Sequence, residues 1–215
     1  MHPSLCGSAG EDRSLILWDT RVANGVAVQI AAAHVDEATC IDFNVCNTHV
    51  FASGGKDGVV KVWDLRCMPR TGVDGRTTGG AIHYAQEHEA DGGIMTLNWS
   101  PHGQAMLATG GADRKVCVWD FSKIGAAQTD AEAEEGPPEL SFVHKGHIEG
   151  ISDFSWNQNA PGVVATVDEG NVLQVWKERT EWTDPDASTD VVVGGSGAVG
   201  TSDGHFLKRS GKNAL

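Results

Sequence analysis

The sequence repeats one short pattern four times, and this repetition limits the possible folds more than any other feature. In each copy a Ser or Thr stands ten positions before a Trp; the pairs are Ser8 with Trp18, Ser53 with Trp63, Thr109 with Trp119, and Thr166 with Trp176. An Asp stands six positions before the Trp in three copies, and Gly170 takes that place in the fourth. Four copies at one spacing predict four structural units of one kind.

Each unit reads as a β-hairpin. In the second copy, FASGGKDGVVKVWDLR, apolar residues alternate with polar ones after a Gly-Asp turn, which is typical of a half-buried strand that follows a tight turn. In three units an aromatic residue stands twenty positions before the Trp, and a His precedes that aromatic residue. The Trp residues are 45, 56 and 57 positions apart. Repeats of roughly 40 to 50 residues indicate the blades of a β-propeller.

The His, hydroxyl and Asp of each unit have the residue types of a catalytic triad. A Ser-His-Asp hydrolase needs one such set in a cleft with an oxyanion hole, whereas here the set recurs from unit to unit. We therefore expect these residues to relay hydrogen bonds that hold each blade together, with the Trp packed between sheets. The predicted structural residues are His34, Ser53, Asp57, Trp63, His88, Thr109, Asp113, Trp119, His147, Thr166 and Trp176. No catalytic residue and no enzyme activity are predicted.

Composition restricts the partners. The net charge of −13 argues against direct nucleic-acid binding, which needs a basic stripe, and suits basic partners or simple solubility. The five cysteines include no CxxC pair, and Cys40, Cys46 and Cys117 stand in or beside strand-like runs, which indicates buried thiols in a reducing compartment. No ligand pair has zinc-site spacing, so neither a metal nor a cofactor is expected. No apolar run is long enough to span a membrane.

Two segments depart from the repeat. Residues 123–140, KIGAAQTDAEAEEGPPEL, hold five acidic residues between Asp130 and Glu139 without a base and lead directly into an apolar strand. Such a run is usually a solvated surface, but acids beside an apolar groove also form a binding arrangement. Residues 183–215 are rich in Gly, Ser and Asp without periodicity, which predicts a flexible, mostly disordered tail after a repeat region of residues 1–182.

The units resemble WD40 repeats, because three of the four Trp residues are followed by Asp. The stretch WDFSKIGAAQTDAEAEEGPPELSFVHKGHIEGISDFSW is similar, nearly residue for residue, to the retinoblastoma-binding, Msi-type histone-binding WD proteins. The similarity covers about residues 4–178 and corresponds to a C-terminal portion of the family pattern. It implies an all-β chain with about three complete blades plus part of a fourth, from a family with seven. We expect such a half-ring to expose blade faces and to self-associate.

The resemblance also implies a function. Members are non-catalytic, nuclear scaffold and chaperone subunits of chromatin assembly, deacetylase, remodelling and Polycomb-type complexes, with the cytoplasm as a second compartment. Their partner is the histone-three/histone-four pair, and the residues that would bind its basic helix are Glu132, Glu134, Glu135, Gly136, Pro137, Pro138, Leu140, Phe142 and Val143. A second site on the top face receives basic peptide tails, and the matching residues are Glu37, Thr39, Met95 and Glu169.

Two other functions fit parts of the sequence. The segments WDTR, from Trp18 to Arg21, and WDLR, from Trp63 to Arg66, resemble the WDxR box that substrate receptors of cullin-type ubiquitin ligases present to the ligase adaptor. The acidic insert also resembles that of glutamate-rich WD proteins of ribosome assembly, although the SKIG and GPPEL segments fit the histone-binding family better.

Overall fold

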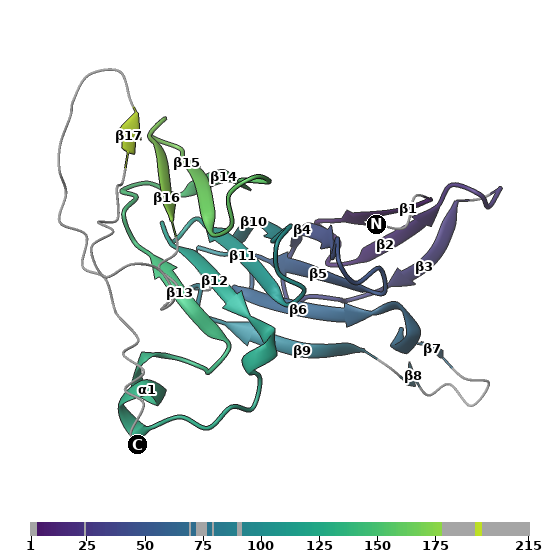
Figure 1. Cartoon of the computed structure of the whole chain (residues 1–215). Coiled ribbons are helices and arrows are strands. Elements are labelled where there is room, and N and C mark those ends of the chain that lie inside the picture. Colours follow the sequence, from purple (N-terminus) through teal and green to yellow (C-terminus); the bar gives the residue numbers. More distant parts are fainter. Residues whose placement is uncertain are drawn as a thin grey trace.

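The computed structural model describes residues 4–23, 25–68, 70–71, 77–78, 80–89, 92–177 and 192–194. These residues form four antiparallel sheets that follow one another in chain order, as the repeats predict (Figure 1). Each sheet is called a blade below and numbered from the N-terminus. The chain is therefore an all-β protein built of propeller blades.

Within each blade, neighbouring strands follow one another in the order of the sequence. Blade 1 holds β1 (Leu5–Ala9), β2 (Leu15–Asp19) and β3 (Val26–Ile30). Blade 2 holds β4 (Ala38–Phe43), β5 (Val50–Gly55), β6 (Val59–Asp64) and β9 (Ala81–Gln86). Blade 3 holds β10 (Ile94–Trp99), β11 (Met106–Gly111), β12 (Val116–Asp120) and β13 (Leu140–His144). Blade 4 holds β14 (Ile151–Trp156), β15 (Val163–Asp168), β16 (Leu173–Lys177) and β17 (Val192–Gly194).

Shorter elements connect these blades. A two-stranded hairpin, β7 (Arg70–Thr71) with β8 (Thr77–Thr78), lies between β6 and β9. Two 3-10 turns follow the WD dipeptides at Leu65–Cys67 and Phe121–Lys123, and each begins with the Asp side chain accepting a backbone N–H. One short helix, α1 (Asp130–Glu135), stands apart from the sheets near the start of β13 (Figure 1). Strand β17 falls inside the predicted tail; residues 183–191 and 195–215 lie outside the described residues.

The hairpin turn that carries the repeated Asp is the same in all four blades. Its closing residue has the left-handed backbone conformation, with φ between 61° and 72°. These closing residues are Arg13, Gly58, Arg114 and Asn171. Glycine and asparagine are common in this conformation, whereas arginine is not. One turn geometry therefore tolerates different sequences. Because the turns are equivalent, the residues of the four blades can be aligned on them.

The apolar core lies between consecutive blades. Trp63 packs with Leu15 and Leu17 across the junction of blades 1 and 2, and Trp119 packs with Val60 and Val62 across the next junction. Alternation along each strand causes this arrangement, because successive side chains point to opposite faces and both faces meet a neighbouring blade. Burying a large apolar side chain contributes about 1.5 to 3 kcal/mol, so each junction is a substantial source of stability.

The central strands are also joined by hydrogen bonds from Trp side chains. The indole Nε1 of Trp99 on β10 donates to the backbone carbonyl of Asp42 on β4, at 3.2 Å. The indole Nε1 of Trp156 on β14 donates to the carbonyl of Asn98 on β10, at 3.0 Å. Each of these Trp residues is the upstream aromatic of its unit. The twenty-residue spacing in the sequence thus encodes a joint between blades.

The cysteines only partly follow the expectation of buried thiols. Cys117 is fully buried on β12, and burial raises the pKa of Cys40 on β4 to about 12. Cys46 is exposed, because it lies in the loop after β4 and not in a strand; the expectation for Cys46 was wrong. All five cysteines are free thiols.

Candidate functional site

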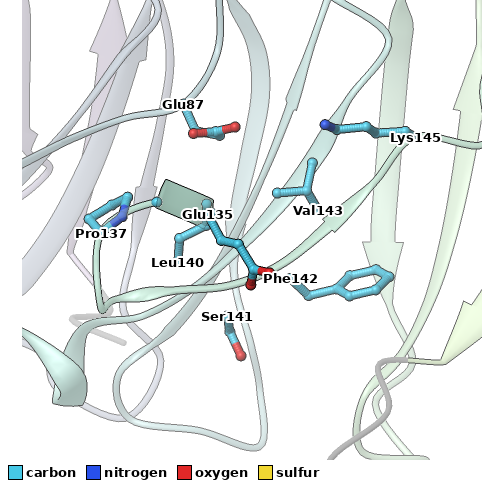
Figure 2. A pocket seen from close by; sticks show the side chains of 9 residues that line it. Glu87, Glu135, Pro137, Leu140, Ser141, Phe142, Val143 and Lys145 are labelled. Carbon is cyan, nitrogen blue, oxygen red and sulfur yellow. The ribbon is translucent and has the colours of Figure 1, made fainter. Parts of the chain in front are cut away.

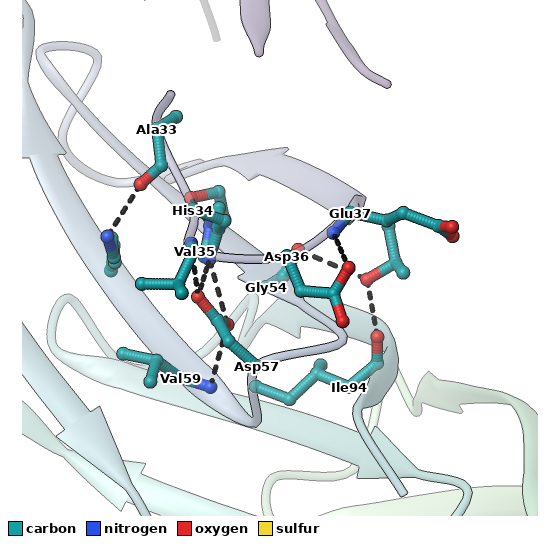
Figure 3. Close-up of polar contacts among 12 residues, drawn as sticks. Ala33, His34, Val35, Asp36, Glu37, Gly54, Asp57, Val59 and Ile94 are labelled. Atoms are coloured by element: carbon teal, nitrogen blue, oxygen red, sulfur yellow. Dashed lines mark hydrogen bonds and ion pairs between the residues drawn. The ribbon is translucent and has the colours of Figure 1, made fainter. Parts of the chain in front are cut away.

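The repeated polar residues of blade 2 meet in one buried chain of hydrogen bonds (Figure 3). Asp57 lies 3.1 Å from His34 Nδ1, and His34 Nε2 lies 2.8 Å from the Ser53 hydroxyl. The indole Nε1 of Trp63 donates to the same hydroxyl at 2.9 Å. A carboxylate can only accept, so Nδ1 of His34 carries the proton that faces Asp57; in the neutral imidazole Nε2 then accepts from the Ser53 hydroxyl, which itself accepts from the indole.

Burial controls the ionisation of this chain of residues. It lowers the pKa of His34 below its ordinary value, although the nearby Asp57 acts in the opposite direction. Burial also acts to raise the pKa of Asp57, but hydrogen bonds from Val35 and Val59 and the adjacent His34 bring it below the usual value (Figure 3). A neutral imidazole beside an ionised carboxylate is the result. The Ser53 hydroxyl is completely buried, so no substrate reaches it.

Blade 3 repeats this geometry closely. His88 contacts Asp113 and Thr109 at 2.9 and 2.8 Å, and the Trp119 indole donates to the Thr109 hydroxyl at 3.0 Å. Thr109 is also completely buried. Two blades with the same buried set of residues indicate a structural role.

Blade 4 completes the same arrangement with a residue that the sequence reading missed. His147 contacts Thr166 at 2.7 Å, and the Trp176 indole donates to that hydroxyl at 3.2 Å. The carboxylate that accepts from His147 Nδ1, at 2.9 Å, belongs to Asp168, which stands two positions before Gly170. The missed signal was an Asp two residues after the hydroxyl residue, at the start of the turn.

Blade 1 contains only part of the arrangement among its described residues. The Trp18 indole donates to Ser8 at 3.0 Å, and Asp12 accepts from the backbone and hydroxyl of Ser14. Hydrogen bonds from Ser14 lower the pKa of Asp12. Here the Asp stabilises the turn without a His.

The acidic segment before β13 folds into helix α1 and a rigid corner. Thr129 caps the helix: its hydroxyl accepts from Glu132 N, while the Glu132 carboxylate accepts from Thr129 N at 2.8 Å. The helix ends at Gly136, whose φ of 133° favours glycine. Leu140 N then donates to the Pro137 carbonyl at 2.9 Å and closes the corner. Glu132 is therefore engaged inside the helix.

A groove lies between this corner and blade 2 (Figure 2). Its lining residues are Glu87, Glu135, Gly136, Pro137, Leu140, Ser141, Phe142, Val143 and Lys145. Six of the nine residues predicted to bind a basic helix are among them, whereas Glu132, Glu134 and Pro138 are not. The sequence analysis missed Glu87, which follows β9 of blade 2, and Lys145, which follows β13. Lys145 directly continues the β13 segment, whereas Glu87 reaches the groove only through the packing of blade 2 on blade 3, so no spacing in the sequence indicates Glu87.

The floor of the groove is fixed by packing. The Phe142 ring lies 5.4 Å from the Trp176 ring of blade 4, and Leu140 is almost fully buried in the core between blades 2 and 3. An apolar floor with carboxylates at its edge can receive an amphipathic segment whose polar face is basic.

Comparison with protein families agrees with these blades. The family model described as WD domain, G-beta repeat matches residues 25–64 and 81–120, which cover most of blades 2 and 3. The chain therefore contains WD40 repeats. Such repeats typically build non-catalytic scaffolds that mediate protein–protein interactions, and the completely buried hydroxyls of Ser53 and Thr109 fit that role.

The top-face residues of the WD40 blades are partly engaged within the protein. Glu37 forms an ion pair with Lys56 at 2.5 Å, and this contact raises the pKa of Lys56. The Thr39 hydroxyl hydrogen-bonds the carbonyls of Gly54 and Ile94 and so joins blades 2 and 3 (Figure 3).

The other two predicted top-face residues lie further along the WD40 array. Met95 is partly exposed on β10, and Glu169 lines a shallow polar depression between blades 3 and 4 with Glu89, Arg114 and Glu149. The structure therefore places one of the four predicted residues, Glu169, in this depression.

The WDxR segments of the WD40 protein have a fixed geometry. The Arg66 guanidinium binds both carboxylate oxygens of Asp64, at 2.9 and 2.6 Å, and lowers the pKa of Asp64 to about 2. Arg21 binds Asp19 in the same way. Both arginine side chains remain about two-thirds exposed, at 65% and 66%.

Other site types receive no support from the described part of the chain. No cluster of three or more potential metal ligands occurs in the residues that the structure describes. Within the same ranges no helix is both long and apolar enough to cross a bilayer.

Proposed function

We propose that this WD40 protein is a histone-binding scaffold or chaperone subunit of chromatin complexes, and that the groove beside α1 holds a basic helix of the histone-three/histone-four pair. The observation that supports the proposal most strongly is the combination of Glu135, Pro137 and Phe142 in one groove. Carboxylates at the rim would pair histone Arg or Lys, and the apolar floor would take the other face of the helix. This role implies a nuclear location.

Charge reversal in the groove tests this function. Glu135→Lys is the cleanest variant, because Glu135 lines the groove, whereas Glu132 caps α1 and its reversal would also disturb the helix; Glu134→Lys, next to the groove, shows whether nearby charge alone matters. We expect each lost charge-assisted contact to weaken histone binding by about 1 to 3 kcal/mol. Glu11→Lys, at an exposed turn of blade 1, is the matched control for net charge. Equal dissociation constants for all variants, measured by calorimetry, would exclude the groove as the histone site.

A second candidate is a substrate receptor of a cullin-type ubiquitin ligase. The support is the pair of exposed, bidentate arginines at equivalent positions of blades 1 and 2. The variant Arg21→Ala/Arg66→Ala should abolish capture of the ligase adaptor while histone binding persists. Adaptor binding at wild-type strength in this variant would remove the second candidate. Ribosomal proteins among the captured partners would instead favour a ribosome-assembly role.

A further inference from the structure

A largely buried hydrogen-bonded contact connects the acidic segment to the neighbouring blade. His83 on β9 of blade 2 lies 2.9 Å, from Nε2 to Oε1, from Glu139, the residue before β13 of blade 3. The Glu139 side chain is 8% exposed and the His83 side chain 21%. Burying a carboxylate costs free energy unless a hydrogen-bond donor satisfies it. This contact therefore strongly favours one relative position of the His83 and Glu139 side chains.

Four hydrogen bonds help to hold the segment between Gln128 and Leu140. Gln128 Nε2 donates to the Gly136 carbonyl, Leu140 N donates to the Pro137 carbonyl, and Asp120 N donates to the Glu139 carbonyl. These three hydrogen bonds join residues of blade 3 and of the segment itself. The fourth joins Glu139 to His83 of blade 2, and it therefore fixes the position of the segment relative to that blade.

The same strand forms the opposite side of the groove. His83, Ala85 and Glu87 alternate along and just beyond β9, so they share one face. Glu87 lines the groove, while Glu135 and Pro137 line it from the acidic segment (Figure 2). The ring of His83 also packs edge-on against Phe121, at 5.6 Å between ring centres, which fixes its orientation.

We propose that His83 is a positioning residue that acts through Glu139 and sets the width of the groove between blade 2 and the acidic segment. It need not touch the bound partner. When the contact is lost, the segment of residues 128–140 keeps the apolar packing of Leu140 but loses its hydrogen bond to His83 of blade 2, and Glu135 moves more freely relative to Glu87. The part of this proposal that concerns affinity rests on the proposed function, whereas the part that concerns the segment does not.

Hydrogen–deuterium exchange of the free protein tests the segment directly. In His83→Leu we expect the amides of residues 128–140 to exchange about tenfold faster, since one net hydrogen bond to a charged group is lost. His83→Gln keeps an N–H donor at a similar reach and should restore slow exchange. His102→Leu is the matched control, because His102 makes a 2.8 Å contact with the Asn157 carbonyl at a different blade junction.

A double variant separates positioning from general destabilisation. His83→Leu/Glu139→Leu leaves no unpaired buried carboxylate, so its melting temperature should recover relative to His83→Leu, yet exchange in residues 128–140 should stay fast. Histone affinity, measured in parallel, should fall about tenfold in both variants and return in His83→Gln. Wild-type exchange in this segment for both Leu variants would overturn the positioning role. If the wild-type protein binds no histone but exchange changes as expected, the proposed function fails and the positioning role stands.

Discussion

The His147 imidazole contacts Asp168, a residue two positions after the hydroxyl of blade 4, whereas the equivalent His34 of blade 2 contacts Asp57, four positions after its hydroxyl. The turns themselves are equivalent, since Gly58 N donates to the Gly55 carbonyl and Asn171 N to the Asp168 carbonyl, both at 3.1 Å. Asp168 therefore occupies the place of Gly55. A Cβ on Gly55 would lie only 2.7 Å from His34 Nδ1, so a side chain there would project at the imidazole and His34 would have to shift to accept it.

This equivalence predicts that the carboxylate can be moved within blade 2. Gly55→Asp alone should destabilise the protein because two carboxylates would crowd His34, and Asp57→Gly alone should cost about 1 to 3 kcal/mol because it leaves the buried N–H without its acceptor. The double variant Gly55→Asp/Asp57→Gly should recover most of that loss. Urea denaturation of the four proteins measures the coupling. Strictly additive losses would show that the two turns are not interchangeable.

A buried His at the end of β13, where blade 3 meets blade 4, predicts acid sensitivity. Burial lowers the pKa of His144 from its ordinary 6.5 to about 4, with its ring stacked on Trp176 and Nε2 bonded to Gln174. Between these two values the unfolded chain binds a proton that the folded chain does not, so stability falls as the pH falls. The loss approaches about 3 kcal/mol near pH 4.

Replacement of this His isolates its contribution. In His144→Phe the ring still stacks, and the fall in unfolding free energy between pH 7 and 4.5 should be smaller than in the wild type. The paired carboxylates Asp57, Asp113 and Asp168, whose pKa values are lowered, should lose their contributions only at lower pH. An unchanged pH dependence in His144→Phe would contradict this assignment.

The corner after α1 should depend on glycine. Gly136 has a φ of 133°, and a Cβ there would lie 2.8 Å from Leu140. We expect Gly136→Ala to cost about 1 to 3 kcal/mol of backbone strain and to disturb the groove. Gly125→Ala is a useful comparison, because Gly125 also has a positive φ but nothing lies near its Cβ position. The proposed groove predicts weaker histone binding for Gly136→Ala than for Gly125→Ala, and equal affinities would oppose it.

The hydrogen bond from the indole to the hydroxyl should contribute more to the free energy of unfolding in blade 2 than in blade 1. The bond from Trp63 to Ser53 is buried, whereas the bond from Trp18 to Ser8 is exposed to water. Trp63→Phe should therefore cost more stability than Trp18→Phe, by about 1 kcal/mol, because it leaves a buried hydroxyl with one partner fewer. Guanidinium denaturation of both variants gives the comparison. A larger cost for Trp18→Phe would contradict the role of burial.

The blades themselves could be predicted from the sequence because their hydrogen-bonded residues keep fixed spacings. The spacing from Ser53 to Trp63 places the two residues on adjacent strands of one hairpin, and the His precedes the first strand of the same blade. In blade 4 the same reasoning found His147 and Thr166 but assigned the Asp position to Gly170. The geometry of a turn can be kept while the residue that supplies a carboxylate changes, so a search by spacing alone misses Asp168.

The groove could be predicted only on one side. Residues Gly136 to Val143 are contiguous, so one segment of sequence contains that wall. Glu87 follows β9 of blade 2, and it reaches the groove only through the packing of one blade on the next. Spacing in the sequence carries no information about such lateral contacts.

The joints between central strands place a sequence requirement on one partner only. Trp99 and Trp156 must each supply an indole N–H, but the acceptors are backbone carbonyls, and the accepting residues are as different as Asp42 and Asn98. Every residue offers the same backbone carbonyl, whatever its side chain. A blade that carries its own Trp can therefore form this one bond with almost any preceding blade, even though other contacts, such as those of the Asp42 carboxylate with Trp99 N and Asn98 Nδ2, need a particular side chain. Duplication or exchange of whole units during evolution would thus keep the indole bond and lose only the side-chain contacts.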